Sequence, residues 1–214
     1  MTNVMGDFGR TPLTPAPRAS YVDRYVCGQR PARFADVTLT TVVFSVWAVF
    51  WICWVLAAAG AKRSVRTSRF RSPGLVVLVA VVLVRLLKPG TLAVSSPVLH
   101  VVGLILFALG LGLAVWARIY LGRNWGMPMT ERAEPELVTS GPYRFVRHPI
   151  YSGILLALLG TALATNLYWL IVLAFLGAYF TYSATVEERL MTTSFPGEYA
   201  RYKAHTKMLI PFVL

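Results

Sequence analysis

Residues 149–188, PIYSGILLALLGTALATNLYWLIVLAFLGAYFTYSATVEE, contain two long apolar runs with a short polar turn between them. The runs cover 150–165 and 167–186, and the turn is Thr165-Asn166. Two helices joined by so short a connection run antiparallel. The stretch therefore predicts a helical hairpin whose two ends return to the same side of the molecule.

The composition of the whole chain places this hairpin in a membrane. Of the 214 residues, 56% are apolar and 14% are charged, and the mean hydropathy is +0.59. These values are typical of membrane proteins. Further apolar runs occupy 37–60, 74–87 and 98–121, so we predict an all-α integral membrane protein with about five transmembrane helices. The small residues in 98–121 predict close packing against a neighbouring helix.

The chain divides into three parts. Residues 1–36 carry prolines and arginines without an apolar period, and they predict a flexible basic arm. Residues 37–121 hold the first three transmembrane helices, and 122–214 hold the hairpin 150–186 and a polar tail. Because the first apolar run begins far into the chain, we expect no cleaved secretory signal peptide.

The net charge of +12 indicates a membrane surface and not nucleic acid as the partner. The cations flank apolar runs, where anionic headgroups and the positive-inside rule account for them. Lys and Arg are more frequent in 62–73, 117–149 and the tail than on the other side of the predicted spans. We therefore expect the N-terminus outside and the C-terminus in the cytoplasm.

Charged residues lie at both ends of the hairpin. Arg147 and His148 precede Pro149, which suits the first position of a helix. Each anion near the start of a helix is stabilised by about 0.3–1 kcal/mol, so two cations at that position are unexpected. Glu187 and Glu188 follow the second apolar run. Since the two helices are antiparallel, both charge pairs should reach the same membrane face.

Two explanations of these charges remain open. In the first, Arg147 and His148 anchor the helix at the membrane interface, and the glutamates pair with them or continue the helix into water. In the second, the charges bind a zwitterion, with its carboxylate held by Arg or His and its ammonium held by Glu. An amino-acid-like cofactor would fit the second explanation.

The motifs around the charges narrow this choice. The segment ELVTSGPYRFVRHPIYSG (136–153) is followed by EERLMTTSFPGEYARY (187–202). Together they resemble the isoprenylcysteine carboxyl methyltransferase and phospholipid methyltransferase superfamily of integral membrane enzymes, over about residues 118–211. The resemblance implies a cytoplasmic pocket in the C-terminal half that binds S-adenosyl-L-methionine. It also implies methyl transfer to a lipophilic acceptor, which is isoprenylcysteine carboxylate-like, a lipid or another small hydrophobic molecule.

The same resemblance implies which residues contact the cofactor. They come from the segment before the Gly-Pro-Tyr turn, from the turn itself, from the Arg-His-Pro-x-Tyr run and from the first glutamate of the pair. In this chain they are Glu136, Leu137, Val138, Tyr143, Arg147, His148, Pro149, Ile150, Tyr151 and Glu187. Asn124 and Trp125 also match the family's text, without an assigned role.

Methyl transfer from a sulfonium is an in-line displacement, so no metal and no covalent nucleophile is required. An amine or phenol acceptor would need a base, and Glu188 and His205 are the candidates. One position departs from the prenylcysteine-directed members, in which an Arg lies four residues before the first glutamate. Here that position is Ser183, which weighs against a prenylcysteine acceptor.

Two other functions are compatible with parts of the pattern. Membrane sterol and steroid reductases, which use NADPH, resemble this chain in an Arg-His-Pro-x-Tyr motif. They usually have Asn between Pro and Tyr and an acid soon after, whereas this chain has Ile150 and then Ser152-Gly153, which favours a methyltransferase. A non-catalytic lipid-binding membrane module is the third possibility, and Ser183 is the residue that supports it.

Overall fold

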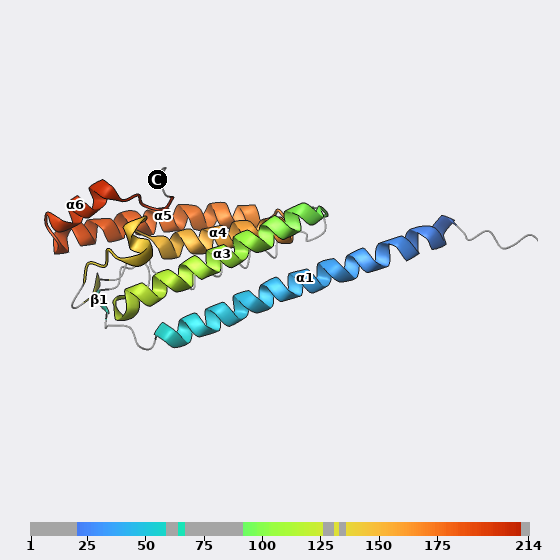
Figure 1. Ribbon diagram of the computed structural model, residues 1–214, viewed down its shortest axis with the longest axis horizontal. Helices are drawn as coiled ribbons and strands as arrows, with labels where there is room; N and C mark the ends of the chain where they lie inside the picture. Colours follow the sequence, from blue (N-terminus) through green and yellow to red (C-terminus); the bar gives the residue numbers. More distant parts are fainter. Residues whose placement is uncertain (1–20, 59–63, 67–91, 126–130, 133–135, 211–214) are drawn as a thin grey trace, which may run out of the picture. The chain divides into compact units, whose positions relative to one another are not determined.

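A computed structural model describes residues 21–58, 64–66, 92–125, 131–132 and 136–210 (Figure 1). They form the helices α1 (Tyr21–Ala58), α3 (Pro97–Leu121), α4 (Pro149–Ala164), α5 (Trp169–Ser194) and α6 (Glu198–His205). Two 3-10 turns, η1 (Gly122–Asn124) and η2 (Gly141–Arg144), follow α3 and precede α4. The strands β1 (Ser64–Arg66) and β2 (Glu131–Arg132) pair antiparallel, with Ser64 opposite Arg132.

Within these residues, three helical stretches are long and apolar enough to cross a membrane, namely Val37–Ala57, Pro97–Asn124 and Trp169–Ser194. Helix α4 is apolar but shorter. The prediction of an all-α integral membrane protein is therefore confirmed, and four of the five predicted spans correspond to α1, α3, α4 and α5. The remaining predicted span, 74–87, lies outside the described residues.

The chain forms two units, which divide between Thr38 and Leu39. The described part of the first unit is helical from Tyr21, so residues 21–36 of the predicted arm belong to α1. Once a helix has been nucleated, each added residue gains a hydrogen bond without a new nucleation cost. A long apolar helix can therefore extend into a polar segment that has no apolar period of its own.

Glycines hold α3 and α4 in close contact. A Cβ atom at Gly110 would lie 2.6 Å from the carbonyl oxygen of Gly153, and one at Gly103 would lie 2.7 Å from that of Gly160. Because Gly103 opposes the end of α4 and Gly110 opposes its beginning, the two helices run antiparallel. The predicted close packing of this span is thus confirmed.

Aromatic residues of α1 pack against the same pair of helices. Trp47 is 7% exposed, and its ring lies 5.7 Å from that of Phe107 on α3. The indole nitrogen of Trp47 donates a buried hydrogen bond to Oγ1 of Thr161 on α4, at 3.0 Å. This contact satisfies both polar atoms within the apolar core.

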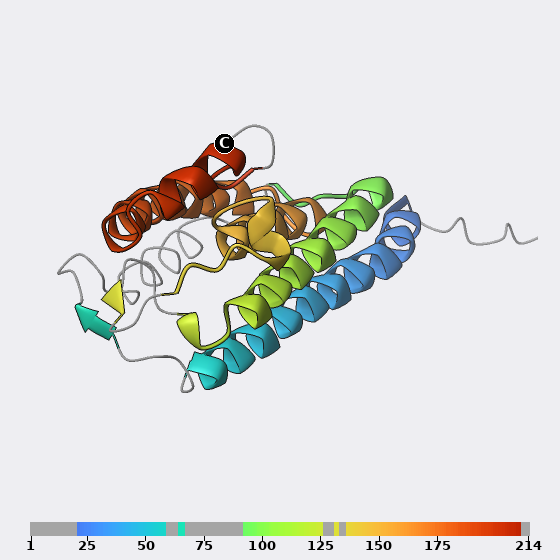
Figure 2. The same ribbon diagram turned by 60° about the vertical axis from the view of Figure 1, so that its left-hand side comes forward.

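The C-terminal ends of α1 and α3 lie side by side (Figures 1 and 2). The guanidinium of Arg118 donates to the carbonyl oxygen of Ala57 at 2.9 Å, and its Cζ atom lies 4.6 Å from the ring centre of Trp125. An arginine is favourable at this place because the last carbonyls of a helix have no intrahelical partner.

Helices α4 and α5 form the predicted hairpin, and its turn has the expected polar residues. Oδ1 of Asn166 accepts a hydrogen bond from the backbone of Tyr168 at 3.1 Å. The boundary predicted at 186 is wrong, since α5 continues to Ser194. Glu187 and Glu188 therefore lie inside the helix and not beyond its end. Glutamate is a good helix former, so nothing in these two residues ends the helix.

Candidate functional site

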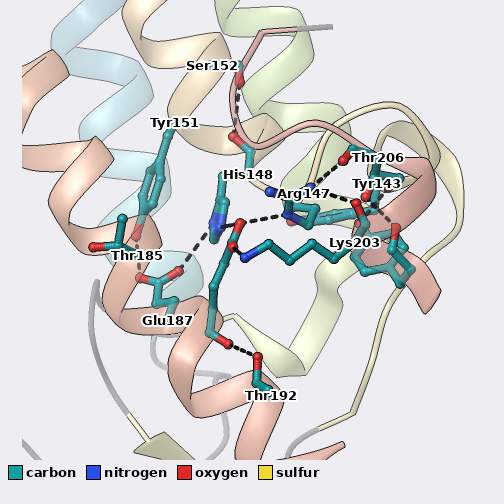
Figure 3. A network of polar contacts seen from close by, with 12 residues as sticks. Tyr143, Arg147, His148, Tyr151, Ser152, Thr185, Glu187, Thr192, Lys203 and Thr206 are labelled. Atoms are coloured by element: carbon teal, nitrogen blue, oxygen red, sulfur yellow. Dashed lines mark hydrogen bonds and ion pairs between the residues drawn. The ribbon is translucent and has the colours of Figure 1, made fainter. Parts of the chain in front are cut away.

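The two charge pairs meet at the open end of the hairpin (Figure 3). Arg147 and His148 precede α4, Glu187 and Glu188 lie on the last part of α5, and Lys203 reaches them from α6. We refer to these five residues as the charged cluster. It confirms the prediction that an antiparallel hairpin brings the cations of 147–148 to the acids of 187–188.

Arg147 is held on several sides. Its Nε atom lies 2.6 Å from Oε1 of Glu188, and Nη1 donates to the backbone carbonyl of Thr206. Its backbone N–H donates to the carbonyl oxygen of Lys207 at 2.8 Å, and that of His148 donates to Met208 at 3.1 Å. The segment after α6 therefore runs beside the start of α4 and is hydrogen-bonded to it.

Both oxygens of the Glu188 carboxylate are engaged. Oε1 contacts Arg147, and Oε2 lies 2.7 Å from Nζ of Lys203. The side chain is only 4% exposed, as is typical of a buried charge with compensating partners. To act as a base, Glu188 would have to leave one of these cations.

Glu187 has a different environment, because a quarter of its side chain is exposed. Its Oε1 atom accepts a hydrogen bond from the Tyr151 hydroxyl at 2.5 Å, and its Oε2 atom lies 3.5 Å from Nδ1 of His148. The ring centres of His148 and Tyr151 lie 5.5 Å apart at 6°, and those of Tyr151 and Phe180 lie 4.5 Å apart at 5°. This stack fixes the orientation of both polar rings beside Glu187.

The two carboxylates raise the pKa of His148. Burial alone would lower this pKa, but hydrogen bonding and charge attraction from Glu187 and Glu188 outweigh burial and bring it above the ordinary value of 6.5. Folding therefore favours the protonated form of His148 relative to the unfolded chain.

This raised pKa predicts a pH dependence of stability. The folded protein binds the His148 proton more tightly than the unfolded chain does, so the resulting stabilisation is complete below about pH 6.5. It is lost as the pH rises through the raised folded-state value. We expect the melting temperature in detergent to fall with rising pH in wild type, and to fall less in His148→Gln. Parallel pH profiles of the two proteins would contradict the assignment.

The turn before α4 is buried as well. Tyr143 in η2 is 6% exposed, and its backbone carbonyl accepts a hydrogen bond from the Tyr202 hydroxyl at 2.6 Å. Burial raises the pKa of Tyr202, so this hydroxyl stays protonated and remains a donor. Gly141 begins the turn at a φ of +59°, a conformation that favours glycine.

The other predicted cofactor residues fall into two groups. Pro149 and Ile150 are buried at the start of α4, whereas Leu137 and Val138 are half-buried in the segment before η2. The carboxylate of Glu136 accepts a hydrogen bond from Nδ2 of Asn124 at 2.6 Å. His205, a predicted base, is exposed on α6, where its Nδ1 atom lies 2.9 Å from the carbonyl oxygen of Arg201 in the same helix.

Four contributing residues were not assigned a role from the sequence: Asn124, Phe180, Tyr202 and Lys203. Asn124 and Tyr202 lie in motif text, so the motif could have indicated them. Phe180 is one of many aromatic residues on α5. Only the rotation of α5, which turns the Phe180 ring toward Tyr151, distinguishes it from the others. Lys203 looks like an ordinary cation of a polar tail, because its partner Glu188 lies on a different helix.

A pocket of about 500 Å³ opens beside the charged cluster. This volume is within the range of small-molecule sites. It adjoins the Glu188–Lys203 pair, and its lining residues are Thr185, Glu188, Arg189, Thr192, Thr193, Lys203 and Met208.

Comparison with known proteins identifies the region that carries this site. Residues 98–198 match the sequence model of the phospholipid methyltransferase family. This part of the chain is similar to that family. The resemblance predicted from the two motif blocks is therefore confirmed. The matched residues include η2, α4, α5 and all of α3 except Pro97.

The chain is similar to a curated bacterial protein and to a solved membrane-protein structure. The cobalt-zinc-cadmium resistance protein CzcN of Cupriavidus metallidurans is 34% identical over 119 residues, which cover 54% of this chain and 50% of CzcN. The chain thus matches about half the length of this curated relative. The eukaryotic intramembrane Ras methyltransferase ICMT (isoprenylcysteine carboxyl methyltransferase) has a similar structure, with a TM-score of 0.51 and 22% identity. The match covers 69% of this chain and 55% of ICMT, and it shows a shared membrane fold.

Proposed function

We propose that the chain is a membrane methyltransferase that uses S-adenosyl-L-methionine to methylate a lipophilic acceptor at the cytoplasmic membrane face. The observation that carries this proposal is the meeting of the family's two motif blocks at one end of the hairpin, where His148 lies 3.5 Å from Glu187. In the proposed orientation the N-terminus is outside, and the charged cluster faces the compartment that holds the soluble cofactor.

The charges suit the amino-acid part of this cofactor. The partly exposed carboxylate of Glu187 would hold its ammonium group. The side chain of His148, in its protonated form, would hold its carboxylate. Arg147 already binds Glu188 and Thr206, so we assign it to holding the start of α4 in place.

The bound cofactor would supply an electrophilic methyl group on a sulfonium sulfur. The residues of the chain then have to orient the two reactants and exclude water. The buried turn residue Tyr143 and the stacked ring of Tyr151 are held in fixed positions at this end of the molecule, so they could orient a bound reactant. Glu188 and His205 stay the candidate bases for an acceptor that has to lose a proton, and Glu188 could serve only after releasing a cation.

The acceptor is further limited by Ser183. This residue is fully buried on α5, four residues before Glu187, and it brings no positive charge to that position. A carboxylate acceptor would need a cation as its counterpart there. We therefore propose a lipid or small hydrophobic acceptor without a carboxylate.

Binding of two cofactors to the detergent-purified full chain tests the proposal. Isothermal titration with S-adenosylhomocysteine should give saturable binding, whereas NADPH should give none. Saturable binding of NADPH alone would favour the reductase, and binding of neither would favour the lipid-binding module. Incubation of lipid extracts with a radiolabelled methyl donor would then identify the acceptor.

Substitutions in the charged cluster should weaken this binding. We expect His148→Gln and Glu187→Gln each to reduce the affinity for S-adenosylhomocysteine by about 1–3 kcal/mol, since each removes a charge-assisted hydrogen bond. His100→Gln and Glu198→Gln are matched controls, because His100 lies at the other end of α3 and Glu198 is exposed on α6. Wild-type affinity in both cluster variants, with the fold intact, would place the cofactor elsewhere.

A further inference from the structure

A buried amide at the end of α3 has no role in the function proposed above. Asn124 lies in η1 and is 6% exposed. Its Nδ2 atom donates to Oε2 of Glu136 at 2.6 Å. Its other polar atom, Oδ1, is buried and has no hydrogen-bond partner among the described residues.

The contact with Glu136 fixes the direction of this amide. A carboxylate oxygen can only accept a hydrogen bond, so Asn124 has to turn its NH₂ group toward Glu136 and its carbonyl oxygen away. The position left open is therefore an acceptor, and only an N–H or O–H group can fill it. Burying an acceptor without a donor is unfavourable, so this oxygen is available to accept a hydrogen bond from a ligand.

The amide lies at the same end of the helices as the charged cluster. The ring of Tyr120, near the end of α3, packs against Gly141 at the start of η2. Gly110 on α3 faces Gly153, one turn into α4, so the end of α3 and the start of α4 lie on the same side. One ligand could therefore reach both regions.

We propose that Asn124 and Glu136 together bind the ribose hydroxyls of the methyl donor's nucleoside. This inference rests on the proposed function. Two neighbouring acceptors match two O–H donors on adjacent carbons. The carboxylate of the amino-acid part has no donor to offer, and its ammonium is assigned to Glu187. The adenine amino group carries both of its donors on one nitrogen, whereas the ribose carries two on separate oxygens, so the ribose is the better match for two separate acceptors.

Titration of the full-length protein with S-adenosylhomocysteine and with its 2′-deoxy and 3′-deoxy analogues tests the inference. Asn124→Leu keeps a similar volume and removes both polar atoms, and Arg123→Gln, an exposed neighbour in η1, is the matched control. We expect Asn124→Leu to weaken S-adenosylhomocysteine about tenfold. Wild type should discriminate about tenfold against at least one deoxy analogue, and the Leu variant should lose that discrimination.

The outcomes separate this inference from the proposed function. If wild type does not bind S-adenosylhomocysteine, the proposed function fails. If wild type binds it and Asn124→Leu binds equally well, only the ribose site is wrong. Equal weakening of all three ligands would show that Asn124 merely supports the turn, which also contradicts the inference. Should the Leu variant not fold, equal affinities of the three ligands for wild type would still overturn it.

Discussion

Replacing Gly110 with alanine is expected to lower the free energy of unfolding by about 3 kcal/mol or more, although only one methyl group is added. The new Cβ atom would lie 2.6 Å from the carbonyl oxygen of Gly153 and 2.8 Å from Cα of Ala157. Both are backbone atoms, so no side chain can move aside. Helices α3 and α4 would therefore have to separate along their whole contact. The turns that position the charged cluster are attached to these helices and would move with them.

Thermal unfolding in detergent, followed by tryptophan fluorescence, would measure this effect. For a chain of this size, the expected loss corresponds to a decrease in melting temperature of about 10 °C. Gly112→Ala is the matched control, because Gly112 lies on the same helix and a Cβ atom there has nothing within 4 Å. Similar melting temperatures for the two variants would contradict the packing described here.

Replacing Glu188 with leucine should have a comparable effect on stability, by a different mechanism. The side chain of Arg147 is 7% exposed, and without Glu188 its buried charge would lack a counterion. Removing one partner of a buried ion pair costs about 3–5 kcal/mol, mainly because the other charge remains buried. Lys203 would be less affected, since half of its side chain is exposed.

A double-mutant cycle would separate this mechanism from a simple loss of packing. Arg147→Met combined with Glu188→Leu removes both buried charges, so the double variant should be more stable than Glu188→Leu alone. Arg189→Ala, next to Glu188 and exposed, is the control for a local change in the helix. If the two single effects simply add, the ion pair is not what stabilises this end of the hairpin.

Much of the fold follows from patterns in the sequence. The apolar runs 98–121 and 150–165 agree closely with α3 and α4, since length and apolarity suffice to define a buried helix. The ends of α1 and α5 were less predictable. Both helices continue into polar segments, where hydrophobicity does not indicate secondary structure. There the preceding or following turns of the helix determine how far it extends.

The site was predictable in its location but not in its pairings. The hairpin requires that Arg147 and His148 meet Glu187 and Glu188, yet the sequence does not indicate which cation binds which acid. The two glutamates point about 100° apart on α5, so the rotation of that helix decides. With that rotation, Glu188 contacts Arg147, and Glu187 faces His148 and Tyr151. Lys203 reaches them because the chain turns at Gly197, which has a φ of +82°. No apolar pattern in the sequence indicates this turn.

The hydrogen bonds from Arg147 and His148 to Lys207 and Met208 join the segment after α6 to the start of α4 through backbone atoms alone. Because no side chain takes part, substitutions at 207 or 208 would leave both bonds in place. A truncation before residue 207 would remove them, although it would leave both helices of the hairpin intact. The beginning of α4 thus depends on a stretch of chain whose position matters more than its side chains.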